Sequence, residues 1–223
     1  MAGPVAAVVF DLDGVLIDSE PVWEEVRRAY VAEHGGRWRP DSQQRLMGMS
    51  TPEWAAYLAN ALGVDRPPEV VAGDVLERMA ERYRQGPPLL PGAVDAVGRL
   101  AARWPLGLAS SSSRELIDLV LEASGLAGRF GATVSTEEVA HGKPAPDAYL
   151  EVAARLGVDP NACAAVEDSS NGVRSAAAAG MRVIAIPSPR YPLDDDASAK
   201  AATVLDHLDE LTAATVENLF QSE

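Results

Sequence analysis

The chain has 223 residues, of which 47% are hydrophobic, so it is long and apolar enough for a large globular domain or a domain with an insert. Its formal net charge of −14 disfavours nucleic acids and anionic membranes as general partners. The single cysteine, Cys163, excludes an intramolecular disulfide, and no apolar run approaches the roughly 18 residues of a membrane span. Because the N-terminus has no secretory pattern, a cytoplasmic location is expected.

The first predicted element is a strand at the N-terminus. Residues Val5–Phe10 form an apolar, partly β-branched run, which is typical of a strand buried on both faces. The run ends at Asp11 and Asp13, and Gly14 allows a sharp turn. Because residues two apart in an extended backbone point to the same side, the carboxylates of Asp11 and Asp13 should lie together. The pair predicts a site for a hard divalent cation, with one carboxylate free to attack an electrophile. The alternative is an ordinary loop in which aspartate side chains bond turn backbone.

Residues 20–86 contain only helical patterns. A helix is predicted from Pro21 to the Gly35-Gly36 pair, a second over about Pro52–Leu62, and a third over Glu69–Arg84. No strand candidate interrupts them. The stretch therefore reads as a helical insert placed just after the first acidic cluster.

From Leu89 onward, strands alternate with helices. This alternation predicts an α/β fold with a parallel sheet in a three-layer arrangement. The expected strands are Leu106–Ala109, Ala132–Val134, Ala162–Val166, Arg182–Ile186 and Thr203–Val204; the expected helices are Gly92–Trp104, Arg114–Ser124, Pro144–Leu156, Asn171–Ala179 and Leu208–Leu219. Asp194–Asp196 is interpreted as a solvated acidic turn.

Unusual polar residues follow several of the predicted strands. Ser110 ends the second strand, Lys143 comes shortly after the third, and Glu167-Asp168 ends the fourth. Ligands of parallel α/β sheets bind beyond the carboxyl ends of the strands. These residues are therefore expected to form one site with Asp11 and Asp13.

Hydrolysis of a phosphate monoester would use such a set. Asp11 is the candidate nucleophile and Asp13 the candidate acid and base, while Mg²⁺ would offset the repulsion between a carboxylate and an anionic phosphate. Asp168, with Glu167 alongside, would supply the second acidic edge of the metal site. The alternative for this pair is simple capping of the helix that follows.

Two further features would contact the phosphate. The hydroxyl of Ser110 and the backbone N–H groups that follow it, beginning with Ser111, suit phosphate oxygens at the start of a helix. Lys143 would supply the fixed positive charge that an acidic site needs. Taken alone, the serine run could be an ordinary helix cap and Lys143 a surface lysine.

Four segments together resemble the sequence motifs of the haloacid dehalogenase-like hydrolases, a superfamily that consists mostly of phosphatases. They are Asp11–Asp18, Leu108–Ser110, Gly142–Asp147 and Ala165–Gly172, in the family order. The resemblance implies a Rossmann-like core, residues 1–17 and 88–223, with a small helical cap, residues 18–87. It also implies site roles: Asp11 and Asp13 catalytic; Ser110, Ser111 and Lys143 phosphate-binding; Asp11, Asp13, Glu167 and Asp168 binding Mg²⁺.

Within the family, the chain is similar to the β-phosphoglucomutase-like branch. Trp23 stands where the mutase pattern has a histidine, and Met47 and Thr51 stand where it has basic residues. The segment Asp18–Pro21 is closer to the hexose- and hexitol-phosphate phosphatases. Asp13 argues against halide chemistry, because the dehalogenases proper lack the second aspartate.

The resulting hypothesis is a Mg²⁺-dependent phosphatase that acts on a small phosphorylated metabolite, a sugar or polyol phosphate, through an aspartyl-phosphate. The alternatives are a phosphosugar mutase and a non-catalytic binding module. Substrate specificity is assigned to the cap residues Glu20, Trp23, Met47 and Gly48, although packing of the cap core explains Trp23 and Met47 equally well. A monomer or weak homo-oligomer is expected, without nucleic acid or membrane partners.

Overall fold

The chain divides into two compact units in the computed structural model, which describes residues 4–46 and 49–221. One unit consists of Met1–Asp18 and Pro88–Glu223, and the other of Ser19–Pro87. The second unit is thus an insertion in the sequence of the first unit, between its first strand and its first helix.

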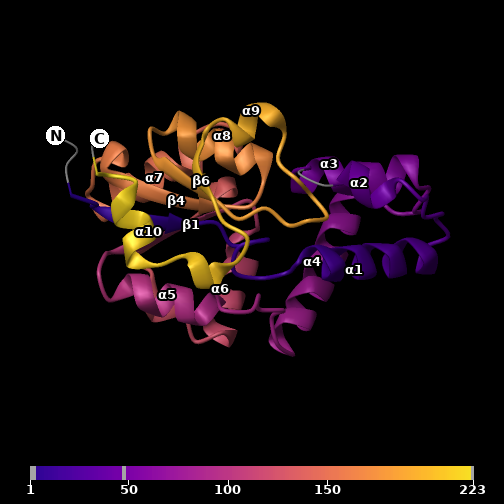
Figure 1. The fold of residues 1–223 in the computed structure, drawn as a ribbon. Coiled ribbons are helices and arrows are strands. Elements are labelled where there is room, and N and C mark those ends of the chain that lie inside the picture. Colours follow the sequence, from indigo (N-terminus) through magenta and orange to yellow (C-terminus); the bar gives the residue numbers. More distant parts are fainter. Residues whose placement is uncertain (1–3, 47–48, 222–223) are drawn as a thin grey trace. The chain divides into compact units, whose positions relative to one another are not determined.

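The larger unit is built on a parallel sheet of six strands in the order β3-β2-β1-β4-β5-β6 (Figure 1). The strands are β1 (Ala7–Phe10), β2 (Leu106–Ser110), β3 (Ala132–Ser135), β4 (Cys163–Glu167), β5 (Arg182–Ala185) and β6 (Ala201–Val204). Each pairs with its neighbour in parallel register. The predicted α/β fold with a parallel sheet is confirmed.

Helices cover both faces of this sheet (Figure 1). On one face lie α5 (Ala93–Ala101) and α6 (Arg114–Ala123); on the other lie α7 (Asp147–Leu156) and α8 (Ser170–Ala178). Shorter pieces complete the unit: η2 (Ala127–Arg129), η3 (Thr136–Glu138), η4 (Pro160–Ala162), α9 (Asp195–Ser198), η5 (Leu208–Glu210) and α10 (Ala213–Asn218).

Strand β1 lies at the centre because its residues are apolar on both faces. All four are fully buried, and Val9 aligns with Gly107 of β2 and with Ala165 of β4. Ala7 and Val9 pack in one core cluster with residues of α7 and α8, so the alternation of a strand turns Val8 and Phe10 to the opposite layer. Each fully buried valine contributes about 1.5–3 kcal/mol to folding.

Several predicted segments differ from the structure. The last helix, predicted over Leu208–Leu219, is split into η5 and α10, because the side chain of Thr212 caps α10 by accepting from the N–H of Thr215 at 3.1 Å. Helix α7 begins at Asp147 and not at Pro144. The acidic turn at Asp194–Asp196 runs into the short helix α9 and pairs with Arg174.

The inserted unit is helical throughout its described residues. It contains α1 (Glu20–Glu33), α2 (Ser42–Leu46), α3 (Thr51–Ala56), the π-helical turn η1 (Tyr57–Ala61) and α4 (Pro68–Arg84). In its core the rings of Trp23 and Trp54 lie 6.0 Å apart, and the guanidinium of Arg27 lies 4.4 Å from the Trp23 ring. Helix α2 was not predicted, because its five residues are mostly polar and show no apolar period.

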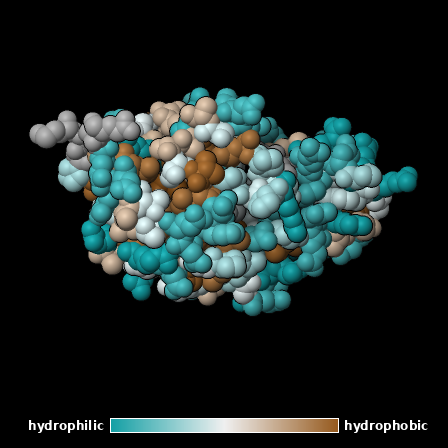
Figure 2. Space-filling view, in the orientation of Figure 1, coloured by the Kyte–Doolittle hydropathy of each residue, from teal (hydrophilic) through white to brown (hydrophobic). Residues whose placement is uncertain are grey.

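The face of the molecule shown in Figure 2 is largely hydrophilic, with hydrophobic residues gathered on the α/β unit. The exposed large hydrophobic residues lie apart in the sequence: Val70, Leu89, Val94, Leu150 and Val204. Across residues 4–46 and 49–221, no helix has both the length and the apolar content needed to cross a bilayer.

Candidate active site

Three strands deliver polar side chains to one edge of the sheet. Asp11 directly follows β1, Ser110 is the last residue of β2, and Glu167 is the last residue of β4. The backbone N–H of Asp11 still donates to the carbonyl of Val166 at 2.9 Å, so the strand pairing holds Asp11 beside β4. The carboxyl ends of parallel strands meet at this edge, which is where such folds bind ligands.

Lys143 joins two of these carboxylates. Its Nζ lies 2.6 Å from Oδ1 of Asp11 and 2.7 Å from Oε1 of Glu167. All three side chains are almost removed from water, with exposed fractions of 5% for Lys143, 7% for Asp11 and 0% for Glu167. Removing one partner of such a buried pair costs about 3–5 kcal/mol, because the remaining charge is left uncompensated.

Asp13 is held by the serine run after β2. Its Oδ2 accepts from the hydroxyl of Ser112 at 2.7 Å and from that of Ser110 at 3.2 Å. Its Oδ1 is buried and has no hydrogen-bond partner among the described residues. A buried carboxylate oxygen without a donor is costly, so this atom is suited to a ligand or to a proton.

Glu167 receives donors on both carboxylate oxygens. Oε1 accepts from Lys143 and from the hydroxyl of Tyr149, the latter at 2.6 Å, while Oε2 accepts from the hydroxyl of Ser169 and from the N–H of Asp168, each at 3.2 Å. Gly172 lies against this carboxylate, and a Cβ at that position would overlap it. The side chain is therefore fixed in one orientation.

The carboxylate of Asp168 lies against the turn that follows β1. Gly14 in this turn has φ of +84°, and a Cβ on Gly14 would overlap the Asp168 carboxylate. Glycine is required there for two reasons, its positive φ and the close approach. The turn thus lets Asp168 approach the two aspartates of the first motif.

Burial and mutual repulsion shift the pKa values of these acids. Burial raises the pKa of Asp11 to about 8; Lys143 opposes the rise, and Glu167 and Asp13 add to it. Burial, followed by the charges of Glu167 and Asp11, raises the pKa of Asp168 well above its usual range. Burial lowers the pKa of Lys143, but the carboxylates of Asp11 and Glu167 outweigh this and leave it raised. Lys143 therefore stays charged.

A divalent metal fits this set of donors. Oxygens of Asp11, Glu167 and Asp168 lie within 4.8 Å of one another, and carboxylate oxygens are the ligands that Mg²⁺ prefers. Burial is the main cause of the raised pKa values of Asp11 and Asp168, and repulsion from the neighbouring acids adds to it, so a bound cation would stabilise the ionised forms. Of the three, Glu167 is already occupied by protein donors, so Asp11 and Asp168 have the freer oxygens.

The structure brings together most of the residues that the sequence predicts for the site. Asp11, Lys143, Glu167 and Asp168 lie in one cluster, and Ser110 contacts Asp13. Ser111 is exposed, and Ser112 is the neighbour whose side chain reaches Asp13. Which of these residues bind metal or phosphate stays a prediction.

Two residues of the cluster were not predicted from the sequence. Ser112 lies in a run of serines that offers no signal to choose among them. Tyr149 lies on the buried face of α7 with Ala148 and Val152, where a tyrosine among small apolar residues could have indicated a buried polar partner. That partner depends on how α7 packs on β4, which the sequence does not show.

The predicted specificity residues belong to the inserted unit. Glu20 accepts from the side-chain amide of Gln43 at 2.5 Å. Trp23 is 9% exposed and packs against Trp54 and Arg27. These contacts agree with the alternative explanation of Trp23, namely packing in the core of the helical unit. Met47 and Gly48 lie outside the described residues.

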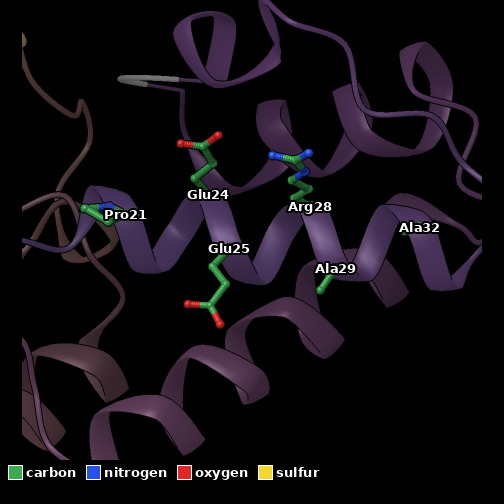
Figure 3. A pocket seen from close by; sticks show the side chains of 6 residues that line it. All are labelled: Pro21, Glu24, Glu25, Arg28, Ala29 and Ala32. Atoms are coloured by element: carbon green, nitrogen blue, oxygen red, sulfur yellow. The ribbon is translucent and has the colours of Figure 1, made fainter.

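An open groove of about 540 Å³ also runs over helix α1 (Figure 3). It is lined by Pro21, Glu24, Glu25, Arg28, Ala29 and Ala32, none of which belongs to the acidic cluster. Figure 3 shows Glu24 and Arg28 on one side of α1 and Glu25 on the other. Since these charged groups do not converge, the groove adds nothing to the site.

The chain matches a family model, haloacid dehalogenase-like hydrolase, over residues 5–180. It belongs to this family of hydrolases. The match includes all four motifs that carried the resemblance, so the family assignment made from them is confirmed.

Named relatives extend the match over most of the chain. Hexitol phosphatase B of Escherichia coli (strain K12) is 36% identical over 215 residues, which cover 94% of this chain and 95% of the relative. Fructose-1-phosphate phosphatase YqaB of the same organism is 30% identical over 80% of this chain and 95% of its own. Among solved structures, a hydrolase of this family from Deinococcus radiodurans with bound phosphate and sodium is 33% identical, with a TM-score of 0.73 over 99% of each chain.

Proposed function

We propose that this hydrolase is a Mg²⁺-dependent phosphatase of small phosphorylated sugars or polyols. The observation that carries the proposal is the pairing of Asp11 with the buried Lys143 at 2.6 Å, next to Asp13 with its unbonded carboxylate oxygen. A nucleophile, a fixed positive charge and a proton carrier are the three groups that phosphate-ester hydrolysis needs.

In the first step a carboxylate oxygen of Asp11 attacks phosphorus. The bond between phosphorus and the sugar oxygen breaks, and that oxygen takes the proton held by Asp13. Lys143 keeps the Asp11 side chain in place and faces the phosphoryl oxygens with a positive charge. The product of this step is an alcohol and an aspartyl-phosphate on Asp11.

In the second step water hydrolyses the aspartyl-phosphate. Asp13, now deprotonated, takes a proton from the water as its oxygen bonds to phosphorus, and Asp11 leaves as a carboxylate. The hydroxyls of Ser110 and Ser112 hold Asp13 by one oxygen, so its other oxygen is the one that carries the proton. Free phosphate is released and each residue returns to its starting state.

Asp11 and Asp168 are the proposed metal ligands, with Asp13 and Glu167 completing the acidic surroundings. Bound Mg²⁺ would neutralise charge on the phosphoryl oxygens and favour the ionised form of Asp11. The inserted helical unit, residues 19–87, is the proposed cap, since its place after the first motif is typical of the family.

The substrate class is supported by the named relatives. The relatives described above are phosphatases of a hexitol phosphate and of fructose 1-phosphate, and both align over most of this chain. The solved relative from Deinococcus radiodurans holds phosphate. These names favour hydrolysis over the mutase alternative, as does the absence of a basic residue at positions 23 and 51.

A phosphate-release screen tests the proposal. Purified protein with MgCl₂ is assayed on hexose, hexitol, pentose and nucleoside monophosphates, and we expect sugar and polyol phosphates to be the best substrates. The variant Asp11→Asn should lose more than about 1,000-fold in kcat while keeping its circular dichroism spectrum, because an amide cannot form the acyl-phosphate. Release of phosphate by this variant at the wild-type rate would refute the nucleophile.

The mutase alternative has its own measurement. Incubation with β-glucose 1-phosphate and a bisphosphate primer is followed by ³¹P NMR. A phosphatase yields inorganic phosphate, whereas a mutase yields glucose 6-phosphate. Isomerisation that outpaces phosphate release would overturn the proposed reaction while leaving the assigned nucleophile intact.

A further inference from the structure

One buried hydroxyl of the site has no role in the steps described above. Tyr149 lies on α7, six residues after Lys143 in the chain, and is fully buried. Its ring packs in the apolar cluster that also contains Ala148, Val152 and Ala153. A phenylalanine would supply the same apolar ring, so the hydroxyl is the part that packing does not require.

This hydroxyl donates to Oε1 of Glu167 at 2.6 Å. A phenol is protonated near neutral pH, so the Tyr149 hydroxyl acts as a donor to this carboxylate oxygen.

The same oxygen, Oε1, also accepts from Lys143 at 2.7 Å. A carboxylate has about four acceptor sites, and Glu167 uses both of its oxygens on protein donors. Loss of the tyrosine donor would leave Lys143 as the sole donor on Oε1 among the bonds described. Glu167 would then lose one of the donors that fix its orientation, and Lys143 would be held less precisely beside Asp11.

Lys143 has three N–H donors, and Asp11 and Glu167 accept from two of them. The third is available to a phosphoryl oxygen. The Lys143 Nζ also lies 5.2 Å from the centre of the Tyr149 ring, so the same residue contacts both members of the Lys143–Glu167 pair.

We propose that Tyr149 is a positioning residue: its hydroxyl holds the Glu167 carboxylate in the orientation that fixes Lys143 beside Asp11, ready for the phosphoryl group. The inference rests on the proposed function, because the phosphoryl group is what Lys143 is positioned to meet. Tyr149 does not touch the reacting atoms, and it acts through Glu167 and Lys143.

The test compares Tyr149→Phe with Tyr30→Phe. Tyr30 is the matched control, because its hydroxyl also donates to a carboxylate, that of Asp74 at 2.7 Å, but within the helical unit. For Tyr149→Phe we expect kcat to fall and KM to rise, with a combined loss of about tenfold in kcat/KM, because a misplaced Lys143 contacts the phosphoryl group less well in the bound substrate and in the transition state. Tyr30→Phe should keep wild-type kcat. Both variants are checked by thermal unfolding.

A binding readout separates this inference from the proposed reaction. Inorganic phosphate is titrated calorimetrically into each protein in the presence of MgCl₂, and Tyr149→Phe should bind it about tenfold more weakly than the wild type. If the wild type hydrolyses no ester but binds phosphate, the proposed function fails and the titration still decides the role of Tyr149. A wild type that neither hydrolyses esters nor binds phosphate overturns both.

A double-mutant cycle with Glu167→Gln assigns the effect to the pair. In that background, adding Tyr149→Phe should weaken phosphate binding by less than about twofold, because the carboxylate that the hydroxyl positions is already absent. Wild-type kcat and phosphate affinity in Tyr149→Phe, with only a stability loss like that of Tyr30→Phe, would show that the hydroxyl is merely structural. Full additivity in the cycle would equally refute the inference.

Discussion

The acidic residues of the site carry more negative charge than Lys143 can offset. Burial raises the pKa of Asp11 from 3.8 to about 8 and that of Asp168 well above 3.8. At pH values between about 4 and about 8, the folded protein therefore binds more protons than the unfolded chain does. The free energy of unfolding of the metal-free protein therefore falls as pH rises from about 4 to about 8.

Mg²⁺ competes with these protons, so its stabilising effect should grow with pH. We expect millimolar MgCl₂ to raise Tm more near pH 8 than near pH 5. For a chain of this size, each kcal/mol of binding free energy raises Tm by about 2–4 °C. Thermal unfolding with and without the salt measures this. Asp11→Asn is the control, and both its pH dependence and its Mg²⁺ shift should be smaller. Equal shifts at both pH values would contradict the acidic site as the place of binding.

The thiol of Cys163 is made unreactive by its buried position in β4. It is fully buried, and burial raises the pKa of its thiol to about 11. We expect no reaction with a disulfide reagent at about pH 8 in the native protein, and one thiol per chain after unfolding in guanidinium. The variant Cys163→Ala has no thiol and gives the background signal of the labelling assay. Rapid labelling of the native protein would contradict the buried position of Cys163.

At the scale of elements, two helical glycines provide a matched pair. A Cβ on Gly172 of α8 would overlap the Glu167 carboxylate, whereas a Cβ on Gly98 of α5 meets nothing within 4 Å. We expect Gly98→Ala to stabilise the protein by about 0.4–1 kcal/mol, because alanine favours a helix. Gly172→Ala should destabilise it by about 1–3 kcal/mol through overpacking and should also lower kcat.

Denaturant titrations and phosphate release measure the two glycine variants side by side. The contrast is the informative quantity, because both changes add the same methyl group to a helix. Equal stabilisation by both would mean that Glu167 can move at no cost, and would remove the structural basis for its fixed orientation.

Element types were predictable where local pattern and tertiary packing agree. The apolar run before Asp11 fixed β1, and the ends of β1, β2 and β4 placed Asp11, Ser110 and Glu167 at one edge. Boundaries were less predictable: Pro144 suits a helix start, yet α7 begins at Asp147 because the preceding loop carries Lys143 to Asp11 and Glu167. The partners of long-range contacts, such as Glu167 for the hydroxyl of Tyr149, had no signal in the local sequence.

At the scale of the whole molecule, hydrogen bonding is distributed unevenly over the sheet. Strands β1 and β4 are paired on both sides, while β6 is paired on one side and Val204 is 50% exposed. Hydrogen exchange followed by mass spectrometry should therefore find peptides of β1 and β4 the slowest and those of β6 faster. Equal protection of β6 and β1 would indicate that the edge is covered in solution.

The chain leaves the α/β unit after Asp18 and re-enters it at Pro88, and the N–H of Asp18 donates to the carbonyl of Pro88 at 2.8 Å. The points at which the chain leaves and re-enters the α/β unit are thus adjacent. Residues 19–87 therefore form an inserted cassette whose two ends meet at one junction, called here the seam. Recombination at that seam could graft the cassette of one relative onto the catalytic sheet of another without altering any strand. With residues 19–87 as the proposed cap, substrate preference and phosphate chemistry would then be free to diversify separately.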